Sequence, residues 1–275
     1  LVRGHSLNLG LVLIKPHDQV FRDPYIPSVM TGFSRAARPR GFRMLVEHIE
    51  SIEDADVIRR MVKGGEVAGL VLTNFHKVEP IIESLVDEDY PVVLLEQPSL
   101  PRFYSASIAH YDGVRMIVNY LIGLGHRHIA CVPYGPTDDH HISRRLAAFR
   151  QALEDAGLEY DARLVRAGLY EPESGYEAMR TLLDCSPRPT AVFGMNDMMA
   201  IGAMRAIHER GLHIPGDIAV VGYDDMRFAA FTTPPLTTVR APEIELGRRA
   251  GELLIDLVEG RKPEVRQINL ATEMI

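Results

Sequence analysis

Cysteine and long apolar runs are scarce in this sequence. Only Cys131 and Cys185 occur among 275 residues, and both lie beside apolar segments. We interpret them as buried free thiols in a reducing compartment, because disulfides belong mainly to secreted chains. No segment reaches the roughly 18 apolar residues of a transmembrane helix, and residues 1–5 do not resemble a signal peptide. These absences predict a cytoplasmic protein that contacts no membrane.

The sequence also lacks an excess of basic residues. It has 30 Lys and Arg against 37 Asp and Glu, a net charge of −7. A surface that grips a nucleic-acid backbone by itself needs the opposite balance. The 46% hydrophobic and 24% charged residues are typical of a globular chain, and the length allows two domains of about 100–150 residues.

Motifs for catalysis, metals and phosphates are missing as well. The glycines of residues 64–69 precede an apolar run, whereas a phosphate-binding loop follows its strand. Neither a P-loop nor a G-x-S-x-G motif is present. The histidine pairs at 126 and 128 and at 140 and 141 are not one helical turn apart, as helix-borne metal ligands would be. The sequence therefore predicts no enzyme, no metal and no cofactor.

What the sequence does contain is a regular alternation of apolar runs and helical segments. Such alternation predicts parallel sheets covered on both faces. The first set has strands at residues 7–14, 43–47, 69–73 and 92–96 and helices at 24–37, 54–63 and 78–89. The second has strands at 129–132, 164–167, 191–194 and 219–223 and helices at 142–156, 174–183 and 198–210. Between them, residues 105–108 are expected to form a short edge or crossing segment, and residues 113–124 a helix. Two similar α/β lobes follow.

The end of the chain defines how these Rossmann-like lobes are joined. Prolines keep residues 234–239 extended, and a helix at 244–258 and a strand at 266–272 follow. We assign that helix to the first lobe and that strand to the second. The lobes are then 7–124 plus 241–259 and 125–240 plus 260–275, joined by three crossovers near Gly125, Arg240 and Gly260. Three connections predict a hinge whose cleft closes on a small molecule.

Polar pairs follow two strands of the second lobe. Asn196 and Asp197 come after residues 191–194, and Asp224 and Asp225 after residues 219–223. The carboxyl ends of parallel strands form one rim, where such sheets bind ligands. Adjacent extended residues point to opposite sides, so only one aspartate of the second pair can face a ligand. An amide and a carboxylate, with an arginine and aromatic rings, suit a ligand rich in hydroxyl groups.

Several longer stretches together resemble the LacI/GalR family of transcription regulators. The matching stretches are LGHRHIACVPYG (124–135), RLAAF (145–149), YEPESGYEAM (170–179), NDMMAIGAMRAI (196–207), VVGYDD (220–225) and PPLTTV (234–239). The resemblance implies a periplasmic-binding-protein-like fold and a dimer that binds operator DNA through an N-terminal helix-turn-helix domain. We expect that domain to be absent here, with residues 1–6 the tail of its linker. The chain is then an effector-binding and dimerisation core whose cleft takes a sugar, a sugar derivative or a nucleoside and controls operator binding allosterically.

The resemblance also assigns effector contacts by position. They are Tyr25, Glu96, Arg145, Tyr170, Asn196 and Asp224. Three positions depart from the family's pattern: Glu96 replaces an aspartate, Ile26 stands where a second aromatic can occur, and Ala148 replaces a glycine. Each contact also has a structural alternative. The arginine and glutamate could form ion pairs, the tyrosines could pack in the core, and Asn196 and Asp224 could cap the segments that follow them.

The same fold also serves the periplasmic sugar-binding proteins of transporters. That function is the alternative from another class, and an enzyme comes third. A helix-turn-helix segment upstream of Leu1 would favour the regulator, and a secretory signal would favour the transporter protein.

Overall fold

The computed structural model describes residues 6–14, 24–50, 56–73, 80–96, 102–135 and 140–275. The chain divides into two compact units. Unit 1 comprises Leu1–Ile108 and Pro242–Leu270, and unit 2 comprises Ala109–Ala241 and Ala271–Ile275. The chain therefore passes from one unit to the other three times, as the sequence predicts.

Unit 1 contains a six-stranded sheet in which every neighbouring pair is parallel. In spatial order its strands are β10 (Gln267–Leu270), β5 (Tyr104–Ile108), β4 (Val92–Leu95), β3 (Gly69–Leu72), β1 (Asn8–Ile14) and β2 (Arg43–Ile49). All four residues of β3 and all four of β4 are buried. Uninterrupted apolar strands of this kind need helices on both faces of the sheet.

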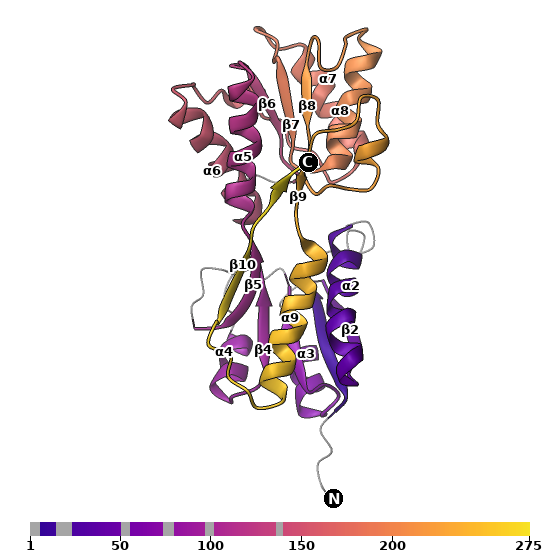
Figure 1. The fold of residues 1–275 in the computed structure, drawn as a ribbon, viewed down its shortest axis with the longest axis vertical. Coiled ribbons are helices and arrows are strands. Elements are labelled where there is room, and N and C mark those ends of the chain that lie inside the picture. The colour runs from indigo at the N-terminus through magenta and orange to yellow at the C-terminus, as the bar shows by residue number, and fades with distance from the viewer. Residues whose placement is uncertain (1–5, 15–23, 51–55, 74–79, 97–101, 136–139) are drawn as a thin grey trace, which may run out of the picture. The chain divides into compact units, whose positions relative to one another are not determined.

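Among the described residues, the helices that cover that sheet are α2 (Tyr25–Ala37), α3 (Asp56–Lys63), α4 (Pro80–Asp87) and α9 (Glu243–Val258). Figure 1 shows α2 and α9 side by side, although most of the chain separates them in sequence. Glycines allow this close approach. A Cβ atom on Gly32 would collide with the Ile244 carbonyl, and one on Gly247 with the Val29 carbonyl. Ile58, Met61 and Ile82 of α3 and α4 pack into one apolar cluster with strand residues.

Unit 2 is built on a shorter parallel sheet. Its strands are β6 (Ile129–Val132), β7 (Ala191–Gly194) and β8 (Ala219–Val221), in that order. Isolated bridges from Val165 and Gly168 to β6 and its continuation, and from Thr237 to β8, extend it on both sides. The helices are α5 (His110–Gly123), α6 (His140–Asp155), α7 (Pro172–Leu183) and α8 (Asp197–Glu209). A short antiparallel pair, β9 (Val239–Arg240) with β11 (Glu273–Met274), completes the unit.

The predicted division of the chain needs two corrections. Residues 109–124 belong to unit 2, where α5 packs against α6 and Arg115 pairs with Asp155 at 2.7 Å. Residues 260–270 belong to unit 1, because β10 pairs in register with β5. Of the three predicted crossovers, only the one near Arg240 lies close to an observed one. An apolar pattern predicts that a strand is buried. Only its pairing with a neighbouring strand decides to which sheet, and so to which unit, the strand belongs.

Two predicted strands also differ. Residues 105–108 lie in an interior strand of the unit 1 sheet, with β4 on one side and β10 on the other. No regular strand forms at residues 164–167. A 3-10 turn at Ala162–Leu164 is followed there by isolated bridges at Val165 and Gly168. The other predicted helices and strands are present with ends shifted by a few residues; the starts predicted for α3 and α4 fall outside the described residues.

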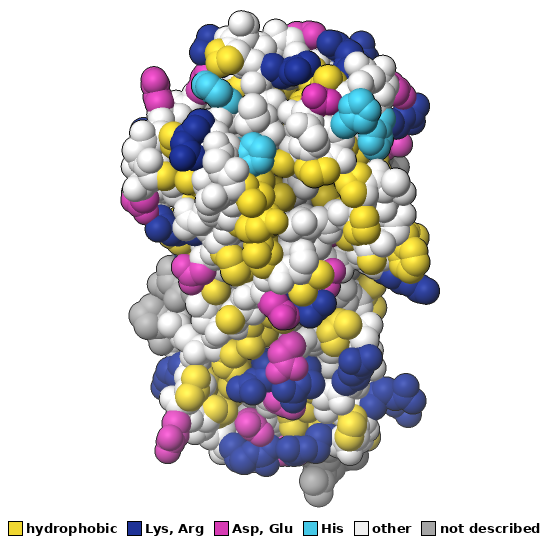
Figure 2. Space-filling model, turned by 45° about the horizontal axis from the view of Figure 1, so that its top comes forward, with side chains coloured by type: hydrophobic (Ala, Val, Ile, Leu, Met, Phe, Trp, Pro, Cys, Tyr) yellow, Lys and Arg dark blue, Asp and Glu magenta, His cyan; other side chains and the backbone are white. Residues whose placement is uncertain are grey.

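The two cysteines differ in environment, although both are free. Cys131 is fully buried in β6, and burial raises the pKa of its thiol far above the usual value. Cys185 is partly exposed, which corrects the expectation that both thiols are buried. No helix in the described ranges is both long and apolar enough to cross a bilayer. On the face shown in Figure 2, basic, acidic and apolar side chains are interspersed.

Candidate functional site

Polar and aromatic side chains gather where the strands of unit 2 end. Tyr134 follows β6, Asn196 follows β7, and Tyr223 and Asp224 follow β8. These strands are parallel neighbours, so their carboxyl ends lie along one edge of the sheet. The sequence predicts this rim.

Arg145 of α6 is the centre of the group. Its side chain is only 9% exposed, yet it carries a permanent charge. The guanidinium carbon lies 5.0 Å from the centre of the Tyr134 ring and 4.8 Å from that of Tyr223. At these distances the ring faces attract a cation. The alternative that Arg145 forms a surface ion pair is therefore wrong.

His110, the first residue of α5, completes the surroundings of this arginine. Its Nδ1 lies 3.0 Å from Arg145 Nη2 and 3.0 Å from the Tyr223 hydroxyl. Arginine can only donate hydrogen bonds, so the imidazole is the acceptor in its contact with Arg145. Burial acts to lower the pKa of Arg145, but Tyr134, Tyr223 and Asp224 more than offset it and raise that pKa. The site therefore holds one fixed positive charge beside a carboxylate.

Tyr170 extends the aromatic wall. Its ring centre lies 4.4 Å from that of Tyr134. Its backbone has φ of 64°, a left-handed conformation that is strained for a bulky residue. The turn is held by Ser174, whose hydroxyl accepts the Leu169 N–H at 2.8 Å and donates to the Glu171 carbonyl at 2.7 Å. The local structure thus fixes Tyr170 against the cluster.

Asp224 and Asp225 have separate roles. Asp225 accepts a 2.7 Å hydrogen bond from Arg240 Nε, so it is the carboxylate that forms an ion pair. Asp224 is near enough to Arg145 to raise the pKa of the guanidinium. Both aspartates have positive φ, 107° at Asp224 and 55° at Asp225. Each strained residue costs on the order of 1–3 kcal/mol and persists only where its surroundings hold it. The prediction that only one aspartate faces the site agrees with this division.

Asn196 caps a helix and still has a donor. It is 2% exposed, and its Oδ1 accepts the Met199 N–H at 2.8 Å, closing the N-terminus of α8. Its Nδ2 makes no hydrogen bond within the described part of the chain. The amide oxygen of Asn196 therefore caps α8, as the structural alternative has it. The amide nitrogen keeps its donors for another partner.

Two candidates belong to unit 1. Tyr25 is the first residue of α2 and is partly buried. Glu96 follows β4 with φ of 59°, and its Oε2 accepts the Ile108 N–H at 3.4 Å. Ile26 is 3% exposed and Ala148 is fully buried. Of the three departures from the family pattern, two therefore lie in cores.

Sequence reasoning did not select His110, Tyr134 or Tyr223 as site residues. Tyr223 is the last residue of the predicted strand 219–223 and is fully buried, so its position in that apolar run assigns it to the core. Its partners His110 and Tyr134 come from other elements. No group of three potential metal ligands occurs among the residues described. The resemblance also links the loop 135–143 to effector specificity, and residues 136–139 of that loop lie outside the described residues.

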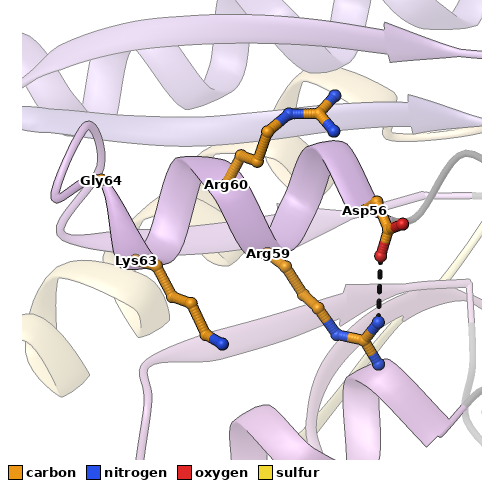
Figure 3. Close-up of a pocket in the computed structure, with 5 residues that line it drawn as sticks. All are labelled: Asp56, Arg59, Arg60, Lys63 and Gly64. Carbon is orange, nitrogen blue, oxygen red and sulfur yellow. Dashed lines mark hydrogen bonds and ion pairs between the residues drawn. The ribbon is translucent and has the colours of Figure 1, made fainter.

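A shallow depression along α3 is a separate feature. Asp56, Arg59, Arg60, Lys63 and Gly64 line it. Figure 3 shows Arg59 turned to Asp56, with a 3.0 Å ion pair, while Arg60 and Lys63 point in different directions. The free cations do not converge, so we assign no ligand to this depression.

The parallel α/β units, with polar and aromatic side chains gathered at the strand ends of unit 2, define a periplasmic-binding-protein-like domain. Comparisons agree with that class: residues 118–275 match the family described as "Periplasmic binding protein-like domain". The regulator CelR of Thermobifida fusca is 32% identical and aligns with 100% of this chain and 82% of its own length. The repressor PurR of Salmonella arizonae is 31% identical, over 99% of this chain and 79% of its own length.

Solved structures are similar over the same extent. A complex of the transcriptional regulator CelR with cellobiose has a TM-score of 0.86 at 31% identity, covering 100% of this chain and 85% of the other. A LacI-family regulatory protein from Chloroflexus aggregans has a TM-score of 0.86 at 33% identity, covering 98% and 97%. The lac repressor dimer bound to operator has a TM-score of 0.84 at 26% identity, covering 99% of this chain and 93% of the other. The chain belongs to the LacI/GalR family and is a ligand-sensing transcriptional regulator, as the resemblance implies, and not a transporter's binding protein.

Proposed function

We propose that Arg145, Tyr170, Asn196 and Asp224 bind the effector, and that Tyr25 and Glu96 also contact it. The observation that carries this proposal is Arg145, a buried charge between two tyrosine rings and near the strained Asp224. Removing an arginine from water is costly unless its environment compensates. A guanidinium binds two oxygens at once, a carboxylate accepts hydroxyl protons, and a ring covers a flat sugar face or base.

The proposed effector is a sugar, a sugar derivative or a nucleoside. Support comes from this donor and acceptor set and from the relative solved with cellobiose. We expect the protein to release its effector chemically unaltered, because no activated nucleophile adjoins the described cluster. The effector can favour one arrangement of the protein only by binding it more tightly. Changing a 1:99 population to 99:1 needs about 5.5 kcal/mol of differential affinity.

Calorimetry with cellobiose, monosaccharides and nucleosides tests the effector site. Arg145→Gln should weaken the binding of whichever of these the wild type binds at least 100-fold, because the amide cannot replace the charge or the paired donors. Arg144→Gln is the matched control. Arg144 is the exposed neighbour on the same helix, so its variant should bind like the wild type. Equal affinities for both variants would contradict the assignment.

We further propose that the protein is a cytoplasmic homodimer that contacts operator DNA through a helix-turn-helix domain outside these 275 residues. The relatives are named HTH-type regulators, and one solved relative is a dimer on operator. Phe228 and Phe231 of unit 2 are 64% and 78% exposed, and exposed aromatics of this size suit a protein interface. Sedimentation velocity should show a dimer that Phe231→Glu dissociates. A monomeric wild type at high micromolar concentration would contradict this part.

A further inference from the structure

Asp197 is a fully buried carboxylate beside the proposed effector contacts. It is the first residue of α8 and is 0% exposed. Its Oδ1 accepts the Thr238 hydroxyl at 2.6 Å, and its Oδ2 accepts the Met226 N–H at 2.6 Å. The Tyr223 N–H also donates to this carboxylate. One side chain thus receives three donors from two segments that follow β8.

A role in its own helix does not account for this arrangement. An acid in the first turn of a helix stabilises the helix dipole without being buried. All three donors of Asp197 lie outside α8. Burial raises the pKa of Asp197 to about 6, despite those donors. Gly222 leaves room for the carboxylate, because a Cβ atom there would collide with Asp197 Oδ1. The backbone before the turn is therefore fitted to this side chain.

The turn that Asp197 holds is the strained one. Asp224 and Asp225, with φ of 107° and 55°, lie between Tyr223 and Met226, whose N–H groups both donate to Asp197. The hydrogen bonds thus bracket the two strained residues. Strained backbone of this kind persists only where its surroundings fix it.

We propose that Asp197 is a positioning residue, which holds residues 223–226 in the conformation that presents Asp224 to the effector and does not touch the effector itself. This inference rests on the proposed function, in which Asp224 is an effector contact. It assigns the two residues of the Asn196-Asp197 pair to different tasks. Asn196 offers its amide to the ligand, and Asp197 shapes the neighbouring turn.

Hydrogen–deuterium exchange tests the positioning role without any ligand. Asp197→Asn keeps the size of the side chain but replaces one acceptor oxygen with a donor that faces N–H groups. The amides of Tyr223 and Met226 should exchange at least tenfold faster, and those of α7 should not change. Leu182→Ala, a cavity in the buried face of α7, is the control for general destabilisation and should leave the turn protected. Unchanged exchange of the turn in Asp197→Asn would overturn the proposal.

Calorimetry with cellobiose tests the effect on the binding site. Asp197→Asn should weaken cellobiose binding at least tenfold, and Leu182→Ala should bind within twofold of wild type. Faster exchange with unchanged affinity would refute the link to the effector. A wild type that does not bind cellobiose counts against that sugar, while exchange still decides the role of Asp197. If Asp197→Asn does not fold, Thr238→Val removes one donor with little change of shape and should give the same effects in smaller measure; a Thr238→Val variant like wild type in both assays would overturn the proposal.

Discussion

The two units share an architecture and differ in what they bury. Among the described residues, the buried polar side chains of unit 1 are neutral: Thr73, Ser105 and Ser107. Those of unit 2 include two ionisable groups, Arg145 and Asp197. Burying an ionisable group costs stability unless it is well paired, and an apolar residue of similar volume is often no worse. Unit 2 therefore contains buried ionisable side chains that the stability of the fold does not require.

The helix packing, in contrast, is the same in both units. Gly32 and Gly247 let α2 and α9 touch through their backbones, and Gly175 and Gly202 do the same for α7 and α8. A shared packing device and different buried charges suggest how to separate framework from site. Five predictions follow from this comparison.

Adding one methyl group at either helix crossing should destabilise the protein by about 3 kcal/mol, the upper end for an overpacked core. A Cβ atom at Gly32 collides with the Ile244 carbonyl, and one at Gly202 with the Pro172 carbonyl. Both obstacles are backbone atoms that cannot rotate away. Gly123→Ala, where nothing lies within 4 Å, should instead be neutral or stabilising. Urea unfolding measures all three, and a tolerated Gly32→Ala or Gly202→Ala would show that the crossings can relax.

The buried acid of unit 2 should make stability depend on pH. Burial raises the pKa of Asp197 from 3.8 to about 6. Because the folded pKa exceeds the unfolded one, the stabilisation is full below about pH 4 and is lost as the pH rises through about 6. The free energy of unfolding should therefore fall by about 3 kcal/mol over this range, relative to Asp197→Asn. Parallel pH profiles for the two chains would contradict this.

Unit 1 offers a contrast to that titration. Burial raises the pKa of Tyr90 to about 12, and its hydroxyl donates to the Val67 carbonyl at 2.7 Å. The stabilisation from this group is lost only above the ordinary tyrosine pKa of about 10. Replacing Tyr90 with Phe should leave the profile between pH 4 and 7 unchanged in shape.

Replacing the buried cation should separate function from stability. Arg145→Met keeps the volume and apolar contacts of the side chain and removes the charge. We expect effector binding to be lost, whereas the free energy of unfolding should change by only about 1–2 kcal/mol, because the lost contacts of the cation with the tyrosine rings and the avoided desolvation of the charge act in opposite directions. Chemical denaturation and calorimetry on the same variant give both values. A loss of several kcal/mol would mean that the charge stabilises the fold.

The smallest effect is expected at the surface of unit 1. Arg40 and Glu259 form a 3.0 Å ion pair with side chains 51% and 32% exposed. Solvent screens such a pair, so Arg40→Gln should change the free energy of unfolding by about 0.5 kcal/mol or less. Added salt should reduce the difference further. Glu259 keeps its second ion pair, with Arg261, in this variant, so a larger change would mean that Arg40 stabilises the fold more than an exposed pair should.

The sequence identifies strands such as β1, β3 and β7 almost to the residue, because an apolar run bounded by turn residues is a local property. It also identifies the rim after β7 and β8, since polar pairs directly follow those strands. It does not identify His110 or Tyr134, because neither has a local signal. Their nearness to Arg145 comes from how α5, β6 and α6 pack. The role of Tyr223 is likewise hidden, since its side chain follows the buried pattern of its strand.

The order of residues alone thus determined the alternating elements, the polar strand ends and the family. Tertiary structure decided that β10 joins β5, that α5 packs with α6, and that Asp225 pairs with Arg240 while Asp224 lies near Arg145. The physical reason is the range of the interactions. Periodicity and turn preference act over a few neighbours, whereas strand pairing and the environment of a buried charge join segments that are far apart along the chain.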